Sequence, residues 1–320
     1  MLPTRDGVGP SCVTLPAGSW PCLIDFLVFR FPAVSKQEWA ERMARGHVVN
    51  SDGNCVAPKH AYRPRSKLYY YRHLAHEAPI AGEERVLFED EFLVAADKPH
   101  FLPVMPSGNY LQETLLVRLR RKLGVAALTP IHRIDRETAG VVLFSKQAAS
   151  RTLYHALFAD RAVHKVYQAI APLPPLHLEL RFPLTHASEL ADSDNFMQVR
   201  EVLTSVNSPG PLNAQTNARK NAKTPAQTTI EWMETQGALA RYRLTPLTGK
   251  RHQLRVHMAA LGMPILGDQI YPVQLAPGSD NPANPLRLLA QSISFRDPIT
   301  AAQRSFTSGQ TLNFPELASG

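Results

Sequence analysis

The sequence predicts an α+β protein, in which a mixed, largely antiparallel sheet follows a small helix-plus-hairpin module. From Arg85 onward the chain contains several runs of alternating β-branched and aromatic residues, with few segments between them long enough for helices. Before Arg85, one amphipathic segment leads into a turn signal and a strand-like run. The length of 320 residues allows about two domains.

The N-terminal module is expected within residues 20–75. Residues 35–46 read SKQEWAERMARG, in which Ser35 can cap a helix and Gly46 suits the position just beyond its end. Residues 51–54, SDGN, form a turn signal between strand-like residues and a tyrosine-rich run. These patterns predict one helix followed by a hairpin.

The larger domain is expected to contain several strands and three helices. The strand-like runs are residues 85–99, 140–146, 164–173, 229–237 and 238–247. The helical segments are residues 111–123, 147–160 and 251–261. The segment 207–227 is poor in apolar residues and rich in Asn, Ala, Thr and Pro, which predicts a mobile loop. The predicted parts are an extension at 1–19, the module at 20–75, a linker at 76–84, the larger domain at 85–310 and a tail at 311–320.

Composition excludes several classes of protein. No apolar run approaches the roughly 18 residues that cross a bilayer, and the N-terminus lacks a signal-peptide pattern, so we expect a cytoplasmic monomer without a membrane partner. The three cysteines form no CxxC pair, which argues against a disulfide framework or a cysteine zinc site. No HExxH motif is present, and His252 and His257 are five residues apart, the wrong spacing for two zinc ligands on one helical face. We expect no metal.

Positive charge favours a polyanionic partner. The formal charge is +8 and the sequence pI is near 9.5. Acid-free basic stretches occur at residues 59–72, 118–122 and 241–257. In the first stretch four tyrosines accompany the cations Lys59, Arg63, Arg65 and Lys67. Cations neutralise phosphates and aromatic rings stack on bases, so this mixture suits nucleic acid, although a solvated hairpin edge has the same composition.

Residues 131–146, IHRIDRETAGVVLFSK, place the carboxylate of Asp135 between two arginines and directly before an apolar run. A partly desolvated carboxylate that guanidiniums keep ionised is a usable nucleophile or general base, and the turn containing Thr138 can fix its aim. The same carboxylate can equally be a structural counter-ion of Arg133 or Arg136 in a surface turn. The local pattern leaves both interpretations open.

A second unusual segment, residues 247–271, crowds histidines, a glutamine and cations together. If residues 251–261 form a helix, its first amides together with Lys250 and Arg251 make an anion site. Arg251 and Arg255 are four residues apart and are expected to point the same way. A phosphate or a base fits this pattern better than a metal.

These segments resemble the RluA family of RNA pseudouridine synthases. HRIDRETAG at 132–140 is similar to the family's HRLDxxTSG signature, and HKVYQA at 164–169 to its KxYxA motif. Residues 247–271 resemble TGRxHQxRxHxxxxGxPIxGDxxY, although Ala139 in the first motif stands where the family usually has serine. DEFLVAADKPHFLPVMPSG at 90–108 and LLAQSISFRDP at 288–298 are similar to its opening and closing stretches. FPAVSKQEWAERMARGHVV at 31–49 resembles an S4-type RNA-binding domain.

The resemblance implies the pseudouridine synthase fold and the conversion of uridine to pseudouridine in RNA, without cofactor or metal. Asp135 matches the catalytic aspartate, Tyr167 the tyrosine that stacks on the flipped uridine, and Arg255 the arginine that pairs with the aspartate. The expected target is large-subunit (23S) ribosomal RNA; the alternatives are transfer RNA, or a non-catalytic role in RNA binding or ribosome assembly. The further RNA contacts expected are His132, Arg133, Arg136, Thr138, Lys165, Lys250, Arg251, His252 and Gln253, together with Lys59, Arg63, Arg65 and Lys67.

Overall fold

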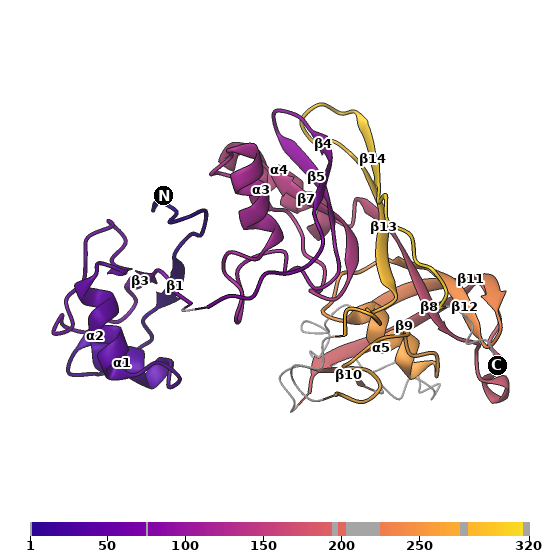
Figure 1. Ribbon diagram of the computed structural model, residues 1–320, viewed down its shortest axis with the longest axis horizontal. Coiled ribbons are helices and arrows are strands. Elements are labelled where there is room, and N and C mark those ends of the chain that lie inside the picture. Colours follow the sequence, from indigo (N-terminus) through magenta and orange to yellow (C-terminus); the bar gives the residue numbers. More distant parts are fainter. Residues whose placement is uncertain (1, 75, 194–197, 203–224, 276–280, 316–320) are drawn as a thin grey trace, which may run out of the picture. The chain divides into compact units, whose positions relative to one another are not determined.

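The computed structural model describes residues 2–74, 76–193, 198–202, 225–275 and 281–315. The chain forms two compact units, the first made of Met1–Pro79 with Met105–Ala126 and the second of Ile80–Val104 with Ala127–Gly320 (Figure 1). Helices and a large, mostly antiparallel sheet are both present, so the predicted α+β class is confirmed. Within the described ranges, no helix has the length and apolarity that a membrane span requires.

The first unit packs helices against a small sheet. Its strands follow the order β1-β3-β2, with antiparallel pairing throughout. The elements are β1 (Ser11–Thr14), α1 (Leu23–Arg30), α2 (Lys36–Ala44), β2 (Val48–Val49), β3 (Lys67–Tyr70) and α3 (Leu115–Leu123). The buried side chains of α1 and α2, Trp39 among them, form one core with the sheet. The predicted capping of α2 is confirmed, because the Ser35 hydroxyl accepts a hydrogen bond from the Glu38 amide and Gly46 has a φ of +67°.

Two predictions about the first unit need correction. The segment 1–19 is more than an extension, because β1 pairs with β3 and Leu15 is buried in the core. The expected helix at 111–123 was assigned to the larger domain, whereas α3 clusters with the first unit, where Val117 packs against Val8. The turn at 51–54 is present, with the Asn50 side chain accepting hydrogen bonds from two backbone amides of the turn.

The second unit is built on one large sheet. Among the described residues it has eleven strands, nine of them in the order β10-β9-β11-β12-β8-β13-β7-β5-β4, with β14 beside β13 and β6 beside β7. All pairings are antiparallel except that between β7 and β13. The strands are β4 (Arg85–Glu89), β5 (Leu93–Lys98), β6 (Thr129–Pro130), β7 (Ala139–Ser145), β8 (Val163–Pro172), β9 (Leu184–Asp192), β10 (Val199–Val202), β11 (Ala226–Gln236), β12 (Leu239–Pro246), β13 (Leu288–Arg296) and β14 (Gln303–Thr307).

Two helices bury the two halves of this sheet. Tyr154 of α4 (Ala148–Ala159) belongs to a core with residues of β5, β7 and β13. Leu254 and Met258 of α5 (Gln253–Ala260) belong to another core with residues of β8, β11 and β12. A short 3-10 turn, η1 (Leu176–Leu178), follows β8. The strands and helices expected from Arg85 onward are thus present, apart from the reassigned α3 and with the run 85–99 divided into β4 and β5. The strands β6, β9, β10, β13 and β14 are additional.

The loop and the tail differ from expectation where they are described. Most of the predicted loop at 207–227 lies outside the described residues, but Ala226 and Gln227 belong to β11 and pair with β9. The tail predicted at 311–320 is described only to residue 315, and Leu312 within it is buried with Leu289 of β13. The chain after β14 therefore contributes to the core.

Candidate active site

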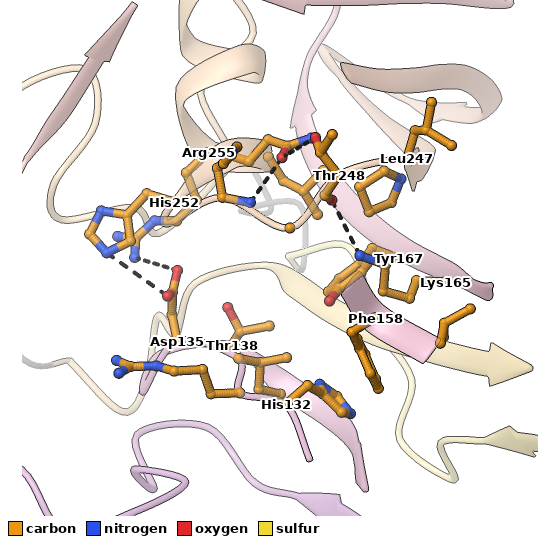
Figure 2. A pocket seen from close by; sticks show the side chains of 18 of the residues that line it. His132, Asp135, Thr138, Phe158, Lys165, Tyr167, Leu247, Thr248, His252 and Arg255 are labelled. Atoms are coloured by element: carbon orange, nitrogen blue, oxygen red, sulfur yellow. Dashed lines mark hydrogen bonds and ion pairs between the residues drawn. The ribbon is translucent and has the colours of Figure 1, made fainter. Parts of the chain in front are cut away.

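A cavity of about 500 Å³ opens in the second unit where β8, α4, α5 and the segment before β7 meet (Figure 2). Among the predicted site residues, those that line it are His132, Arg133, Asp135, Thr138, Lys165, Tyr167, Lys250, His252, Gln253 and Arg255. The three motifs that lie far apart in the sequence therefore meet in one place.

Asp135 lies in the connection between β6 and β7. The Thr138 amide donates a hydrogen bond to the Asp135 carbonyl at 3.1 Å, which closes the turn just before the buried strand begins. The Asp135 carboxylate is 23% exposed, so it faces the cavity while most of its surface is covered. Figure 2 shows it directed toward Arg255 and His252.

Arg255 is the partner of Asp135, as expected from the resemblance. Arg255 Nη1 lies 3.4 Å from Asp135 Oδ2 and 3.4 Å from Glu137 Oε2, and its side chain is fully buried. Its shortest contacts are to Asp268, whose two oxygens accept from Nη2 at 2.7 Å and from Nε at 2.8 Å. Burial alone lowers the pKa of Arg255, but the hydrogen bonds and charge of Asp268, with those of Asp135 and Glu137, raise it overall.

The structural alternative for Asp135, a surface ion pair with an adjacent arginine, does not match this geometry. Arg136 pairs with Glu137 at 3.2 Å and lies over the ring of Phe101, and Arg133 is exposed at the cavity rim. The second group beside the carboxylate is His252, whose Nε2 is 3.9 Å from Asp135 Oδ1. Burial lowers the pKa of His252, so this imidazole is neutral at pH 7.

Lys165 and Tyr167 face the cavity from β8. They are two residues apart on a strand, so their side chains share one face of the sheet. Lys165 Nζ donates to the Thr248 carbonyl at 3.2 Å, and burial lowers the pKa of Lys165. Burial, together with the nearby charge of Asp135, raises the pKa of the Tyr167 phenol, which keeps it protonated at neutral pH.

Two predicted RNA contacts have structural roles instead. Gln253 is buried: its side-chain oxygen accepts hydrogen bonds from Thr248 and Lys250, and its amide nitrogen donates to the Gln227 carbonyl and the Thr228 hydroxyl. These bonds use its polar atoms and hold the loop before α5 in place. His132 Nε2 accepts the Leu143 amide at 3.1 Å, and its ring stacks on Phe158. Both side chains shape the cavity wall.

The expected anion site at the start of α5 is not formed as predicted. His252 precedes the helix with a left-handed φ of +54°, and the Lys250 amide already bonds to Gln253. Arg251 points away from Arg255, because its guanidinium bonds to the Asp192 carboxylate and the Gln198 carbonyl, each at 3.0 Å. Lys250 remains exposed at the cavity.

Cations of two of the three basic stretches pair with acids. Across the strand pair β11–β12, Arg241 bonds to Glu234 and Arg243 to Glu231. In the first unit, Arg118 pairs with Glu113. The first stretch differs, because four of its five cations are exposed and have no ion pair within the described residues. These cations are Lys59, Arg63, Arg65 and Lys67.

Comparison with known proteins identifies the family. The RNA pseudouridylate synthase family matches residues 92–260, which contain the whole cavity except Leu288. The chain belongs to this family. It is 32% identical over 227 residues, 91% of the relative's length and 69% of its own, to the dual-specificity RNA pseudouridine synthase RluA of Pasteurella multocida. It is 29% identical to an RNA pseudouridine synthase of Synechocystis, covering 78% of this chain and 79% of the relative.

The fold comparison agrees. The solved structure of human RNA pseudouridylate synthase domain containing 1 superposes with a TM-score of 0.54 at 19% identity, covering 73% of this chain and 86% of the other. The chain is thus an RNA pseudouridine synthase of the RluA type, an isomerase that acts on RNA.

Sequence reasoning about this pseudouridine synthase missed three charged residues at the site. Asp268 and Glu137 both contact Arg255, and the signals available were their places in the quoted motifs, LGD and HRIDRE. Lys98 is fully buried, and its Nζ donates to the carbonyls of Pro99 and Arg136. Burial lowers the pKa of Lys98 to about 7, against the opposing charges of Glu137 and Asp135.

Proposed function

We propose that Asp135 is the catalytic residue of this synthase and that its target is a uridine in large-subunit (23S) ribosomal RNA. The observation that carries the first part is the pairing of a partly exposed carboxylate with a fully buried guanidinium at the wall of the cavity. A buried cation keeps a neighbouring carboxylate ionised, which a nucleophile or base requires.

The reaction breaks the bond between N1 of uracil and C1′ of ribose, turns the base, and forms a bond from C5 to C1′. The proton on C5 then leaves and N1 gains a proton, so that atoms and charges balance without a cofactor. Asp135 either bonds covalently to the sugar or base during this exchange or removes a ribose proton to give a glycal. His252 and Arg255 stand on one side of the carboxylate and can limit its motion.

Tyr167 is proposed to stack on the flipped uracil. Flipping costs a few kcal/mol of lost base stacking, which an aromatic face in the pocket offsets. Because the phenol stays protonated at neutral pH, stacking and hydrogen bonding suit Tyr167 better than direct removal of the C5 proton as a phenolate.

The choice of ribosomal RNA is supported by the first unit, proposed here as an S4-like RNA-binding module. Its four exposed cations accompany partly exposed tyrosines, including Tyr69 and Tyr70, on a unit separate from the cavity. Such a surface adds phosphate contacts and stacking beyond the target nucleotide, which suits a large folded RNA. The relative from Pasteurella multocida is described as dual-specificity, so transfer RNA is the second candidate.

The catalytic assignment is tested by Asp135→Asn. This change preserves the size of the side chain and removes its charge, so RNA affinity should stay within about twofold while pseudouridine formation is lost. Asp192→Asn is the matched control, since Asp192 is 87% exposed and pairs with Arg251 outside the cavity. Turnover by Asp135→Asn near the parent rate contradicts the assignment.

The substrate is tested by mapping pseudouridine in all cellular RNA with and without the gene, and after re-expression of the Asp135→Asn variant. Loss of one site in large-subunit ribosomal RNA that the variant does not restore supports the proposal. Loss confined to transfer RNA replaces ribosomal RNA with that substrate. No lost site, together with intact RNA binding, favours the non-catalytic role in RNA binding or assembly.

A further inference from the structure

Three side chains of types that commonly bind transition metals meet outside the catalytic cavity. His186 of β9, Glu201 of β10 and His257 of α5 each place one ligand atom within 4.8 Å of the other two. His186 Nε2 lies 2.7 Å from Glu201 Oε1, and His257 Nε2 lies 4.0 Å from the same oxygen. None of the three lines the catalytic cavity.

The fold assembles and shelters this cluster. On β9, His186 lies opposite Thr228 of β11, and on β10, Glu201 lies opposite Leu190 of β9. The side chains of His186 and Glu201 still meet, and α5 supplies His257 from 56 residues further along the chain than Glu201. The side chains of His186 and Glu201 are 22% and 16% exposed, and that of His257 is fully buried. The two imidazole rings are perpendicular with centroids 4.7 Å apart. An ion therefore needs only small side-chain shifts to bind.

Neighbouring hydroxyl groups orient the possible ligands. His257 Nδ1 lies 3.0 Å from the hydroxyl oxygen of Thr228, a buried residue on β11, so its other nitrogen faces the cluster. In metal sites the second nitrogen of a ligating histidine is usually held by such a partner. The Ser188 hydroxyl donates to Glu201 at 2.9 Å and lies 3.2 Å from His257 Nε2, beside two of the ligand atoms.

We propose that His186, Glu201 and His257 bind one divalent transition-metal ion, and that zinc is the ion they fit best. Two imidazoles and one carboxylate form an established type of zinc ligand set. With zinc bonds of about 2.0–2.2 Å, tetrahedral geometry places neighbouring ligand atoms about 3.4 Å apart. That value lies between the 2.7 Å and 4.0 Å separations from Glu201 Oε1. Ser188 or a water completes the coordination, and His186 binds as the neutral tautomer that carries its proton on Nδ1, which leaves Nε2 free for the ion.

The ion has a structural role in this arrangement. It links the β9–β10 pair to α5, the helix that carries Arg255 two residues before His257. An ion that binds the folded chain and not the unfolded chain stabilises the folded state, by an amount that increases with the concentration of free metal. Zinc is therefore expected to raise the unfolding temperature and to hold α5 in place, and the proposal is independent of which RNA is the substrate.

The test titrates zinc into the full chain after a chelator has stripped it, in competition with a chromophoric chelator. The variants are His186→Gln and Glu201→Gln, because both side chains are partly exposed and their replacement should leave the fold intact. His257 is not replaced, because it is fully buried. His177→Gln is the matched control, since His177 is exposed and outside the cluster. Circular dichroism verifies that each variant is folded.

The wild type and His177→Gln should bind one zinc per chain, and zinc should raise their unfolding temperatures. Both cluster variants should bind zinc at least about tenfold more weakly than the wild type. Loss of a residue that only hydrogen-bonds a metal ligand already lowers metal affinity about 10- to 100-fold, and these variants lose a ligand itself. X-ray absorption on the zinc-loaded chain should show two imidazole nitrogens. Equal affinity in wild type and the cluster variants overturns the site, as does a folded wild type that binds no stoichiometric zinc.

Discussion

At the scale of single residues, the buried guanidinium of Arg255 interacts with three carboxylates at the site. Arg255 makes its shortest contacts with Asp268 and longer contacts of 3.4 Å with Asp135 and Glu137. Asp268 also accepts the amides of Ile270 and Tyr271, so its position is set by the backbone around it. Asp268 therefore positions Arg255, while Asp135 is held loosely enough to meet a substrate.

We predict that Asp268→Asn destabilises the protein by about 3–5 kcal/mol, the usual cost of leaving one member of a buried ion pair without its partner. Asp268 is 1% exposed and Arg255 fully buried, so solvent cannot replace the lost charge. The measurement is the free energy of unfolding in urea. Asp192→Asn breaks an exposed pair and should change that free energy by about 1 kcal/mol at most. A similarly small loss for Asp268→Asn contradicts the positioning role.

His132 makes stability depend on pH. Burial, with a smaller contribution from the charge of Lys165, lowers the pKa of His132 to about 3, from an ordinary value of 6.5. The folded-state pKa is the lower one, so the stabilisation is complete above pH 6.5 and is lost as the pH falls toward 3. Between pH 7 and pH 5 the unfolded state gains most of one extra proton at this position, which costs about 2 kcal/mol of stability.

Urea unfolding at pH 7 and pH 5 measures this effect. His132→Asn removes the titrating ring that accepts the Leu143 amide, and the variant should lose less stability than the wild type over this interval. His177→Gln, at an exposed position, should retain the wild-type dependence. If His132→Asn has the same pH dependence as the wild type, other groups are responsible.

At the scale of elements, one close approach of two strands positions the turn that carries Asp135. Strands β7 and β13 run parallel, with Gly140 opposite Ala290. Gly140 has a φ of +115°, and a β-carbon added there would lie 2.2 Å from the Ala290 carbonyl oxygen. Only glycine satisfies both conditions, which explains this residue five positions after Asp135 in the signature.

Gly140→Ala should therefore destabilise the protein by about 2 kcal/mol or more, through backbone strain and a clash with the neighbouring strand. It should also lower pseudouridine formation, because the turn that carries Asp135 leads directly into this strand. Thermal unfolding and a turnover assay measure the two effects. Gly9→Ala is the control, since a β-carbon at Gly9 meets nothing within 4 Å. Unchanged stability in Gly140→Ala would falsify the close-approach explanation.

At the scale of the whole molecule, the chain combines a catalytic unit with a basic unit. Acids from neighbouring strands offset much of the positive charge of the sheet, whereas the cations at 59–67 stay exposed without ion pairs in the described part of the chain. The two units should therefore contribute differently, the second to chemistry and the first to affinity.

Replacing Lys59, Arg63, Arg65 and Lys67 together by glutamine should weaken RNA binding without changing the rate at saturating RNA. Each lost phosphate contact reduces the slope of log affinity against log salt by about 0.7–0.9, so loss of all four contacts reduces it by about 3–3.5. Binding at several salt concentrations measures this slope. The control replaces four exposed arginines of the second unit, Arg85, Arg181, Arg200 and Arg296. Equal slopes in both variants contradict a specific role for the first unit.

Local chemistry in the sequence was enough to predict much of the molecule. Capping by Ser35, the strand alternation after Arg85 and the three motif segments all depend on near neighbours, and the structure contains each of them. The strands β6, β9, β10, β13 and β14 were not predicted, because pairing with neighbouring strands contributes to their stability as well as their own composition.

Only the tertiary structure determined which cations have an acidic partner and which possible metal ligands lie close together. The stretch 241–257 contains no acid, yet Arg241, Arg243 and Arg251 are neutralised by acids that the folded sheet and loops bring beside them. The sequence favoured no metal because His252 and His257 lack the spacing of ligands on one helix, whereas His257 in fact meets His186 and Glu201 from two other strands. The motifs in the sequence determine which side chains the site contains. Long-range packing sets the distances between those side chains, and these distances decide which ion pairs and ligand clusters form.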